Sequence, residues 1–307
     1  MINEEQQNEE NKASESGSNS ESYTPKAAAV EPETAQETAS SGSFGFERPN
    51  EDLIWISRKV SQVRQEMGKF VIGQEQMVDL LMAGIFCNGH ILLEGVPGVA
   101  KTLSSKVMAK ALDIDFSRIQ FTPDLMPSDV IGTSVFNMKD SSFTFKKGPV
   151  FSNIVLIDEI NRAPAKTQAA LFEVMEERQI TYDGQQYKME FPFLVVATMN
   201  PIEQEGTYSL PEAQLDRFLF KIKVYHPELD QETEILKRYK NTIKAPALDQ
   251  IQAVFNASEI QKIQDLIEKL VIEDRLLHYI AAITIKTRNH AKIYLGASPR
   301  ASLSMLK

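Results

Sequence analysis

The sequence contains a single cysteine, Cys87. One cysteine excludes an internal disulfide and any metal site built from clustered cysteines. Cys87 ends the apolar stretch 83–87, so we expect it to be a small buried hydrophobic residue. Long apolar runs are also missing, since none approaches the roughly 20 residues needed to span a bilayer, and the N-terminus lacks a signal-peptide pattern. We therefore expect a soluble, cytoplasmic protein without a membrane segment.

Positive charge is scarce as well. The chain of 307 residues has 33 Lys and Arg against 42 Asp and Glu, a formal net charge of −9. Residues 1–44 carry nine Glu and two Lys, a net charge of −7, which leaves the remainder near −2. A nearly neutral body without a basic stripe argues against nucleic acid as the main partner. Residues 1–44 also hold almost no large apolar side chains, so we predict a disordered acidic tail over residues 1–48.

A Gly- and Pro-containing loop joins a predicted strand at 91–94 to a predicted helix that opens at Lys101. Backbone N–H groups in such a loop point at phosphate oxygens, and the helix N-terminus adds its positive dipole. Lys101 would reach the β- and γ-phosphates of a nucleotide, and the Thr102 hydroxyl would bind Mg²⁺. The alternative interpretation is an ordinary strand-to-helix turn with a chance Lys-Thr pair.

Ala100 departs from the usual pattern of this loop, G-x-x-x-x-G-K-[ST], which has glycine before the lysine. A methyl group fits there at little cost if the residue already has the negative φ of an incipient helix. We therefore expect an intact phosphate loop in which Ala100 has a negative φ.

Two more predicted strands end in polar residues. The apolar run 154–157 ends in Asp158 and Glu159, and the run 193–198 is followed by Met199 and Asn200. The carboxyl ends of parallel strands meet at one edge of a sheet, where ligands bind. Asp158 can hold Mg²⁺ through its water shell, Glu159 can polarise the attacking water, and Asn200 can hold that water or sense the γ-phosphate. The alternatives are solvated acids at a strand end and an Asn-Pro turn.

The order of strands and helices predicts an α/β fold. Apolar strands alternate with helices as far as residue 224, which indicates a parallel sheet with right-handed crossovers. Residues 133–148 and 179–191 alternate around polar centres and read as β-hairpins inserted into this order. The pattern becomes wholly helical from residue 248. We expect an α/β nucleotide-binding core at 49–245 and a small all-α lid at 246–307, truncated because the chain stops early in its last helix.

Several strings together resemble one family. They are 95–102, Asp158-Glu159-Ile160-Asn161-Arg162-Ala163-Pro164, Ala197-Thr198-Met199-Asn200-Pro201, 203–208 and Leu210-Pro211-Glu212-Ala213-Gln214-Leu215-Asp216-Arg217-Phe218. These strings are similar to the motifs of the MoxR family of AAA+ ATPases, in the same order. The likeness spans roughly residues 50 to 307, and Ala before the Lys is common in that family. The two hairpins resemble the helix-2 insert and the pre-sensor-1 hairpin of the same group.

The resemblance implies roles for further residues. Asn200 would be the sensor-1 residue, Arg217 the arginine finger and Arg300 the sensor-2 arginine. Ser298-Pro299 resembles a helix start, so Arg300 is expected to project from it near phosphate. The alternatives are a structural ion pair of Arg217 with a neighbour such as Asp216 or Glu212, and a solvated surface position for Arg300. The predicted nucleotide-binding residues are Gly95, Val96, Pro97, Gly98, Val99, Ala100, Lys101, Thr102 and Leu103, with Ile72 and Gly73 beside the adenine.

The implied function is that of a motor on protein clients. A MoxR-like AAA+ ATPase would hydrolyse Mg-ATP in a homo-oligomeric ring, expected to be a hexamer, and remodel a client such as a von Willebrand factor A domain protein. Phe143 and Phe145 on the first hairpin would either contact substrate in the pore or pack on the hairpin. One alternative is a nucleic-acid translocase related to the minichromosome maintenance helicases. The other is a nucleotide-gated scaffold with little turnover.

Overall fold

A computed structural model describes residues 51–139, 141–201, 208, 210–240 and 248–307 of the chain, which belong to one compact unit, Arg48–Lys307. The predicted acidic tail and the motif residues 203–207 lie outside the described residues. The helices are α1 (Glu51–Gly68), α2 (Glu75–Phe86), α3 (Lys101–Ala111), α4 (Pro127–Ile131), α5 (Ala165–Glu177), α6 (Glu212–Leu215), α7 (Leu229–Tyr239), α8 (Ala257–Glu268), α9 (Asp274–Arg288) and α10 (Pro299–Leu306), with short 3₁₀ helices at Ile160–Arg162 and Leu248–Gln250. The strands are β1 (His90–Gly95), β2 (Phe116–Gln120), β3 (Gly132–Asn137), β4 (Ser142–Lys147), β5 (Ile154–Asp158), β6 (Gln179–Tyr182), β7 (Gln185–Lys188), β8 (Leu194–Met199) and β9 (Phe218–Val224).

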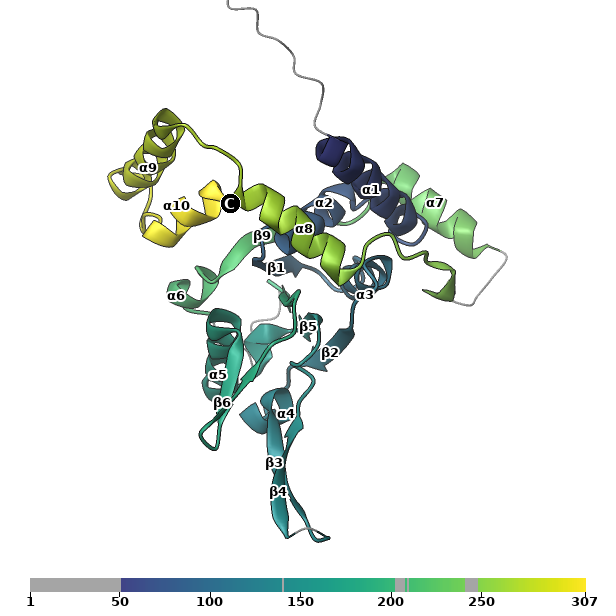
Figure 1. Cartoon of the computed structure of the whole chain (residues 1–307). Coiled ribbons are helices and arrows are strands. Elements are labelled where there is room, and N and C mark those ends of the chain that lie inside the picture. Colours follow the sequence, from purple (N-terminus) through teal and green to yellow (C-terminus); the bar gives the residue numbers. More distant parts are fainter. Residues whose placement is uncertain (1–50, 140, 202–207, 209, 241–247) are drawn as a thin grey trace, which may run out of the picture. The chain divides into compact units, whose positions relative to one another are not determined.

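Five parallel strands form the central sheet, in the order β2-β5-β8-β1-β9 (Figure 1). Every residue of β5 is buried, as are the first five residues of β8. Continuous apolar strands of this kind are typical of parallel sheets that are covered on both faces. The sheet, the two hairpins and the helices that follow confirm the predicted α/β fold.

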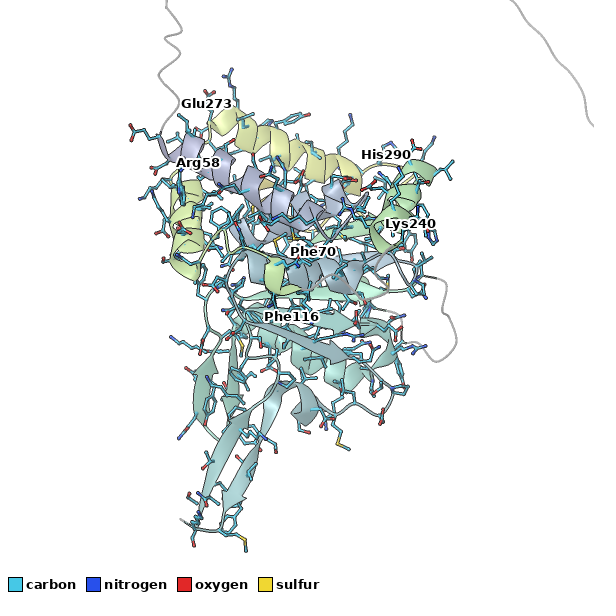
Figure 2. All side chains as sticks on the ribbon, turned by 90° about the vertical axis from the view of Figure 1, so that its right-hand side faces the viewer. Arg58, Phe70, Phe116, Lys240, Glu273 and His290 are labelled. Atoms are coloured by element: carbon cyan, nitrogen blue, oxygen red, sulfur yellow. The ribbon has the colours of Figure 1, made fainter. Side chains whose placement is uncertain are left out.

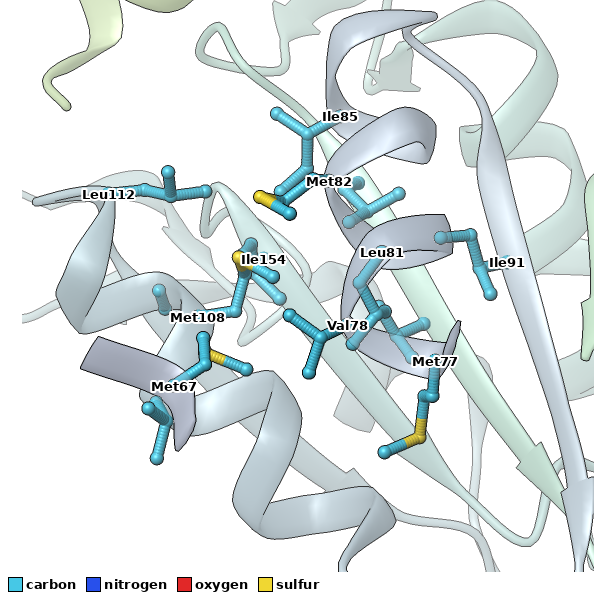
Figure 3. Packing of buried hydrophobic residues seen from close by; sticks show 14 of the residues in the cluster. Met67, Met77, Val78, Leu81, Met82, Ile85, Ile91, Met108, Leu112 and Ile154 are labelled. Atoms are coloured by element: carbon cyan, nitrogen blue, oxygen red, sulfur yellow. The ribbon is translucent and has the colours of Figure 1, made fainter. Parts of the chain in front are cut away.

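The hydrophobic core has two parts because successive residues of a strand point to opposite faces of the sheet. Ile91 and Leu93 of β1 belong to the cluster that packs against α1, α2, α3 and α8, whereas Leu92 belongs to the cluster against α5. Figure 3 shows residues of the first cluster, among them Met67 of α1, Met77 and Met82 of α2 and Met108 of α3. Methionine is flexible enough to fill irregular gaps between helices and a sheet.

Both predicted hairpins are present. β3 pairs antiparallel with β4, and β6 pairs antiparallel with β7 through a turn in which Asp183 and Gly184 both have positive φ. Phe145 packs on Tyr182 and Tyr187 with ring centroids 4.9 and 4.5 Å apart, so it joins the two hairpins. Phe143 is 71% exposed, on a hairpin that extends away from the sheet (Figure 2). Phe145 therefore packs between the two hairpins, whereas Phe143 packs only on Phe136 of its own hairpin among the ring contacts of the described residues.

The last three helices differ in how they pack. Helix α8 begins with a capping box between Asn256 and Glu259, and its Ile260 and Ile263 are buried in the first core cluster. Helices α9 and α10 pack on each other, and Ser302 donates a hydrogen bond to the buried Thr284 at 2.8 Å.

No helix among the described residues is long and apolar enough to cross a membrane. Cys87 is half-buried rather than buried as expected, and its partial burial raises the pKa of its thiol.

His90 stands at the start of β1 and is held in one protonation state by its surroundings. Its Nδ1 accepts a hydrogen bond from the Val195 backbone N–H at 3.0 Å, so Nε2 carries the proton and donates to the Met175 carbonyl at 3.0 Å. Burial is the main cause that lowers the pKa of His90, to about 4. The ring is therefore neutral in the folded chain at neutral pH.

His90 should make stability depend on pH. Because its pKa is about 4 when folded and ordinarily 6.5, the unfolded chain binds more protons between these values, and stability is lost as pH falls through this window. The loss between pH 7.5 and 5 should be roughly 2 kcal/mol. Urea unfolding at both pH values should show this excess loss for the natural chain relative to His90→Gln, which does not titrate. Equal losses in the two proteins would contradict the assignment.

Candidate active site

The phosphate loop connects the end of β1 to the start of α3, as predicted. A β-carbon on Gly95 would lie 2.6 Å from the Val224 carbonyl oxygen, and Gly98 has a φ of +87°, so both positions favour glycine. Lys101 is the first residue of α3, and its Nζ donates a hydrogen bond to the Gly95 carbonyl across the loop. The lysine is thus folded back over the loop whose N–H groups would receive phosphate.

The expectation of a negative φ at Ala100 is wrong. Ala100 has φ 61° and ψ 18°, in the left-handed region that favours glycine. Its carbonyl nevertheless accepts hydrogen bonds from the backbone N–H and the hydroxyl of Ser104, both at 2.9 Å, which begin the helix. The usual pattern has glycine at this position because glycine adopts this backbone conformation readily. Alanine adopts the same conformation at a cost of about 1 kcal/mol in stability.

Asp158 ends β5 with its side chain 9% exposed. Its Oδ1 accepts a hydrogen bond from the Thr198 hydroxyl at 3.2 Å, and its Oδ2 lies 3.4 Å from the Thr102 hydroxyl. A hydroxyl and a carboxylate supply oxygen ligands of the type that Mg²⁺ prefers, so these residues fit the ion. Thr102 and Asp158, predicted as a pair, therefore lie together.

Glu159 follows in a strained conformation, with a φ of 57°. Its backbone N–H donates to the Thr198 hydroxyl oxygen at 3.0 Å. Its Oε2 accepts from Gln120 Nε2 at 2.7 Å and lies 3.1 Å from Arg162 Nη1. The carboxylate is thus held at the edge of the sheet by neighbours from β2 and from the turn after β5.

These residues surround one cleft of about 390 Å³. The predicted residues Lys101, Thr102, Asp158, Glu159 and Asn200 all line it, and Asn200 is buried at the end of β8. The lining also includes Pro97, Gly98, Ala100, Leu103, Arg118, Gln120 and Thr198. The loop after β1 and the ends of β2, β5 and β8, which are far apart in the chain, therefore supply one site, as the topology of a parallel sheet predicts.

A second cleft of about 250 Å³ shares Gly98, Ala100 and Leu103 with the first. Ile72, predicted beside the adenine, lines it together with other largely apolar residues. Gly73 is absent from the lining. A β-carbon on Gly73 would lie 2.4 Å from Gln231 Oε1, so this glycine serves close packing against α7. A partly apolar cleft joined to a phosphate loop suits a flat base.

Arg217 and Arg300 both bind Glu176 near the end of α5. Arg217 Nη1 lies 2.9 Å from Glu176 Oε2, and Arg300 Nη2 lies 2.6 Å from Glu176 Oε1. Arg217 does form an ion pair, as the alternative interpretation predicted, but its partner is Glu176 rather than Asp216 or Glu212. Asp216 instead accepts hydrogen bonds from the Ser298 hydroxyl at 2.7 and 2.9 Å. The Ser298 N-cap is present, but Arg300 does not line the nucleotide cleft of its own chain.

Sequence reasoning missed Arg118, Gln120 and Thr198. Arg118 and Gln120 belong to β2, which pairs with β5 in a register that puts Gln120 beside Asp158. A signal was present: both polar residues alternate with Ile119 at the end of a predicted parallel strand, whose carboxyl end meets the same edge as Asp158. Thr198 belongs to the predicted strand 193–198, but nothing in the sequence indicates a role for its hydroxyl inside the sheet.

The geometry defines an α/β protein with a phosphate loop and an acidic strand end, the arrangement of a nucleoside-triphosphate-binding core. A model of the ATPase family associated with various cellular activities (AAA) matches residues 90–220. Chaperone MoxR1 of Mycobacterium tuberculosis is 44% identical over 250 residues, covering 78% of this chain and 65% of MoxR1. The uncharacterised protein YeaC of Bacillus subtilis is 42% identical over 243 residues, 79% of this chain and 75% of YeaC.

A solved structure has a similar fold and sequence. A protein of Cytophaga hutchinsonii, described as a candidate ATPase, is 44% identical, with a TM-score of 0.71 over 83% of this chain and 82% of that chain. The chain belongs to the MoxR family of AAA+ ATPases. It is an ATPase with a nucleotide-binding core.

Replacing Ala100 by glycine should stabilise the chain by about 0.5–1 kcal/mol, because glycine adopts a positive φ without the steric cost that alanine has. Urea unfolding should show a higher midpoint with an unchanged slope. The matched control is Ala109→Gly, at a buried position in the last turn of α3, which should destabilise by about 1 kcal/mol or more. If both variants lost stability equally, the left-handed conformation of Ala100 would be refuted.

Proposed function

We propose that the chain hydrolyses Mg-ATP in the cleft at the carboxyl edge of its sheet. The observation that carries this proposal is the convergence of Lys101, Thr102, Asp158, Glu159 and Asn200 on one cleft. A cation, a hydroxyl, two carboxylates and an amide are the groups that phosphoryl transfer to water requires. Their positions at three strand ends allow all of them to face one nucleotide.

Each residue has a distinct task in this proposal. Lys101 leaves the Gly95 carbonyl to pair with phosphate oxygens, while Thr102 and Asp158 hold Mg²⁺, which neutralises charge on the phosphates when bound. Glu159 accepts a hydrogen bond from the attacking water and takes its proton, and Asn200 orients that water. Glu159 must therefore exchange part of its present hydrogen bonding to Gln120 and Arg162 for water.

Arg217 and Arg300 serve a neighbouring subunit in this proposal. Neither lines its own cleft, and they hold two positive charges against the single carboxylate of Glu176. An unbalanced pair of guanidinium groups is suited to a partner's phosphates. The chain would thus assemble into a ring, a hexamer, with core residues 49–245 carrying the cleft and residues 246–307, largely α9 and α10, acting as a lid.

A protein is the proposed client of the ring. The β3–β4 hairpin exposes Val135, Phe136, Met138 and Phe143, each at least 48% exposed, and Phe136 packs against Phe143 with ring centroids 5.1 Å apart. Exposed apolar side chains gathered in this way favour contact with protein. MoxR1 is named a chaperone. We propose a client of the von Willebrand factor A domain type, handled in the cytoplasm.

Glu159→Gln should keep nucleotide binding and lose turnover by a factor of about 10² or more, because only proton transfer from water is removed. Lys101→Ala should lose both, since it removes a direct phosphate contact. The two measurements are the dissociation constant for ATP and the steady-state release of phosphate. Equal loss of ATP affinity in the two variants would overturn the assignment of Glu159.

Arg217→Ala should also be nearly inactive while it still binds ATP, since a trans-acting arginine contributes about 10³ to 10⁵ in rate. Mixing tests the trans role. An Arg217→Ala chain retains Lys101 and Glu159, and a Glu159→Gln chain retains Arg217, so co-assembled rings contain some complete composite sites. The mixture should recover part of the phosphate release.

Subunit exchange in that mixture must be shown separately, with two fluorescent labels. Arg58→Ala, at an exposed position on α1, is the control arginine deletion and should leave activity unchanged. If exchange occurs and the mixture stays as inactive as each variant alone, Arg217 does not act in trans.

A further inference from the structure

Arg118 makes the closest ionic contact with Asp158 among the described residues. Its Nε lies 2.6 Å from Asp158 Oδ2, which is within the range of a strong charge-assisted hydrogen bond. Arg118 comes from β2, one of the two edge strands of the sheet, and its side chain is 53% exposed whereas that of Asp158 is 9% exposed. A long, partly solvated arginine thus reaches in to neutralise a nearly buried carboxylate.

The contact falls on the oxygen that also faces the phosphate loop. Asp158 Oδ2 lies 3.4 Å from the Thr102 hydroxyl, while Oδ1 accepts from Thr198. Arg118 and Thr102 both line the cleft. The guanidinium therefore lies at the side of Asp158 where a metal held jointly with Thr102 would have to approach.

Arg118 also donates a hydrogen bond to a residue of its own strand. Its Nη2 donates to Gln120 Oε1 at 3.3 Å, and Gln120 in turn donates to Glu159. The two acids of the site thus have separate cationic or amide partners on β2, and Glu159 has an additional arginine, Arg162. Only Arg118 among these groups bonds the oxygen that Thr102 faces.

We propose that Arg118 is the counter-cation of Asp158 and competes with Mg²⁺ for this carboxylate, so that it sets the Mg²⁺ concentration at which the site loads nucleotide. A nearly buried carboxylate without a partner is costly, so the empty site gains from an internal cation. A divalent cation at the same oxygen meets both the occupied lone pair and the positive charge of the guanidinium. Because Arg118 is half exposed, it can move into water when Mg²⁺ binds.

This inference rests on the proposed function, since it concerns the metal of that site. The test uses a fluorescent, non-hydrolysable ATP analogue with the full chain, titrated with MgCl₂ at a fixed analogue concentration, and reads the Mg²⁺ concentration at half-maximal binding. Arg118→Ala should lower this midpoint about tenfold, the size expected from losing one charge-assisted hydrogen bond that competes with the ion. Arg118→Gln, which keeps a long polar side chain without charge, should behave alike and guards against a folding defect in the alanine variant.

Arg162→Ala is the matched control, because it removes the same charge from the neighbouring acid Glu159 and should leave the midpoint unchanged. An equal fall with Arg162→Ala would show a general charge effect and overturn the proposal. An unchanged midpoint for the Arg118 variants would leave Arg118 a structural partner of Asp158, and overturns it too. Weaker analogue binding both with Mg²⁺ and with chelator would make Arg118 a phosphate contact instead. If the natural chain binds no analogue at any Mg²⁺ concentration, the proposed function itself fails.

Discussion

The candidate site depends on the parallel pairing of β5 with β8. Their register sets Ile157 opposite Ala197, so Asp158 and Thr198 follow side by side at the carboxyl edge. The Thr198 hydroxyl then donates to Asp158 and accepts from the backbone of Glu159, which ties both acids to the neighbouring strand. A slip of one residue would turn these side chains to the opposite face of the sheet and separate them. The register of the strands therefore decides whether the side chains of the cleft come together at all.

Much of this arrangement could be predicted from local sequence. Continuous apolar runs mark the inner strands, and polar residues directly after them mark the edge where ligands bind, because parallel strands share one direction. The hairpins could be predicted for a similar reason, since alternation and a turn pair such as Asp183-Gly184 are local signals. The motif regions at the ends of β5 and β8 follow from the strand-end rule, and the phosphate loop follows from its Gly- and Pro-containing turn and the Lys-Thr pair that begins a helix.

Contacts between residues distant in the chain could not be predicted in this way. Glu176 lies 41 residues from Arg217 and 124 from Arg300, and no periodic pattern encodes that a single carboxylate binds both. Arg118 likewise binds Asp158, 40 residues away, instead of extending into solvent. The prediction of a negative φ for Ala100 is wrong for another reason. Alanine alone prefers negative φ, and the surrounding loop overrides this preference.

The shared carboxylate of Glu176 has a thermodynamic consequence. Each of its oxygens accepts from a different arginine, one beside β9 and one on α10. An anion that draws Arg217 away leaves both oxygens to Arg300, and a movement of α10 that withdraws Arg300 leaves both to Arg217. Linkage of this kind is reciprocal. Whether Arg217 is bound to Glu176 therefore affects how strongly Arg300 binds it, and the reverse, although the two arginines need not contact each other. One glutamate on α5 thereby makes the sheet edge and the C-terminal helices parts of a single equilibrium.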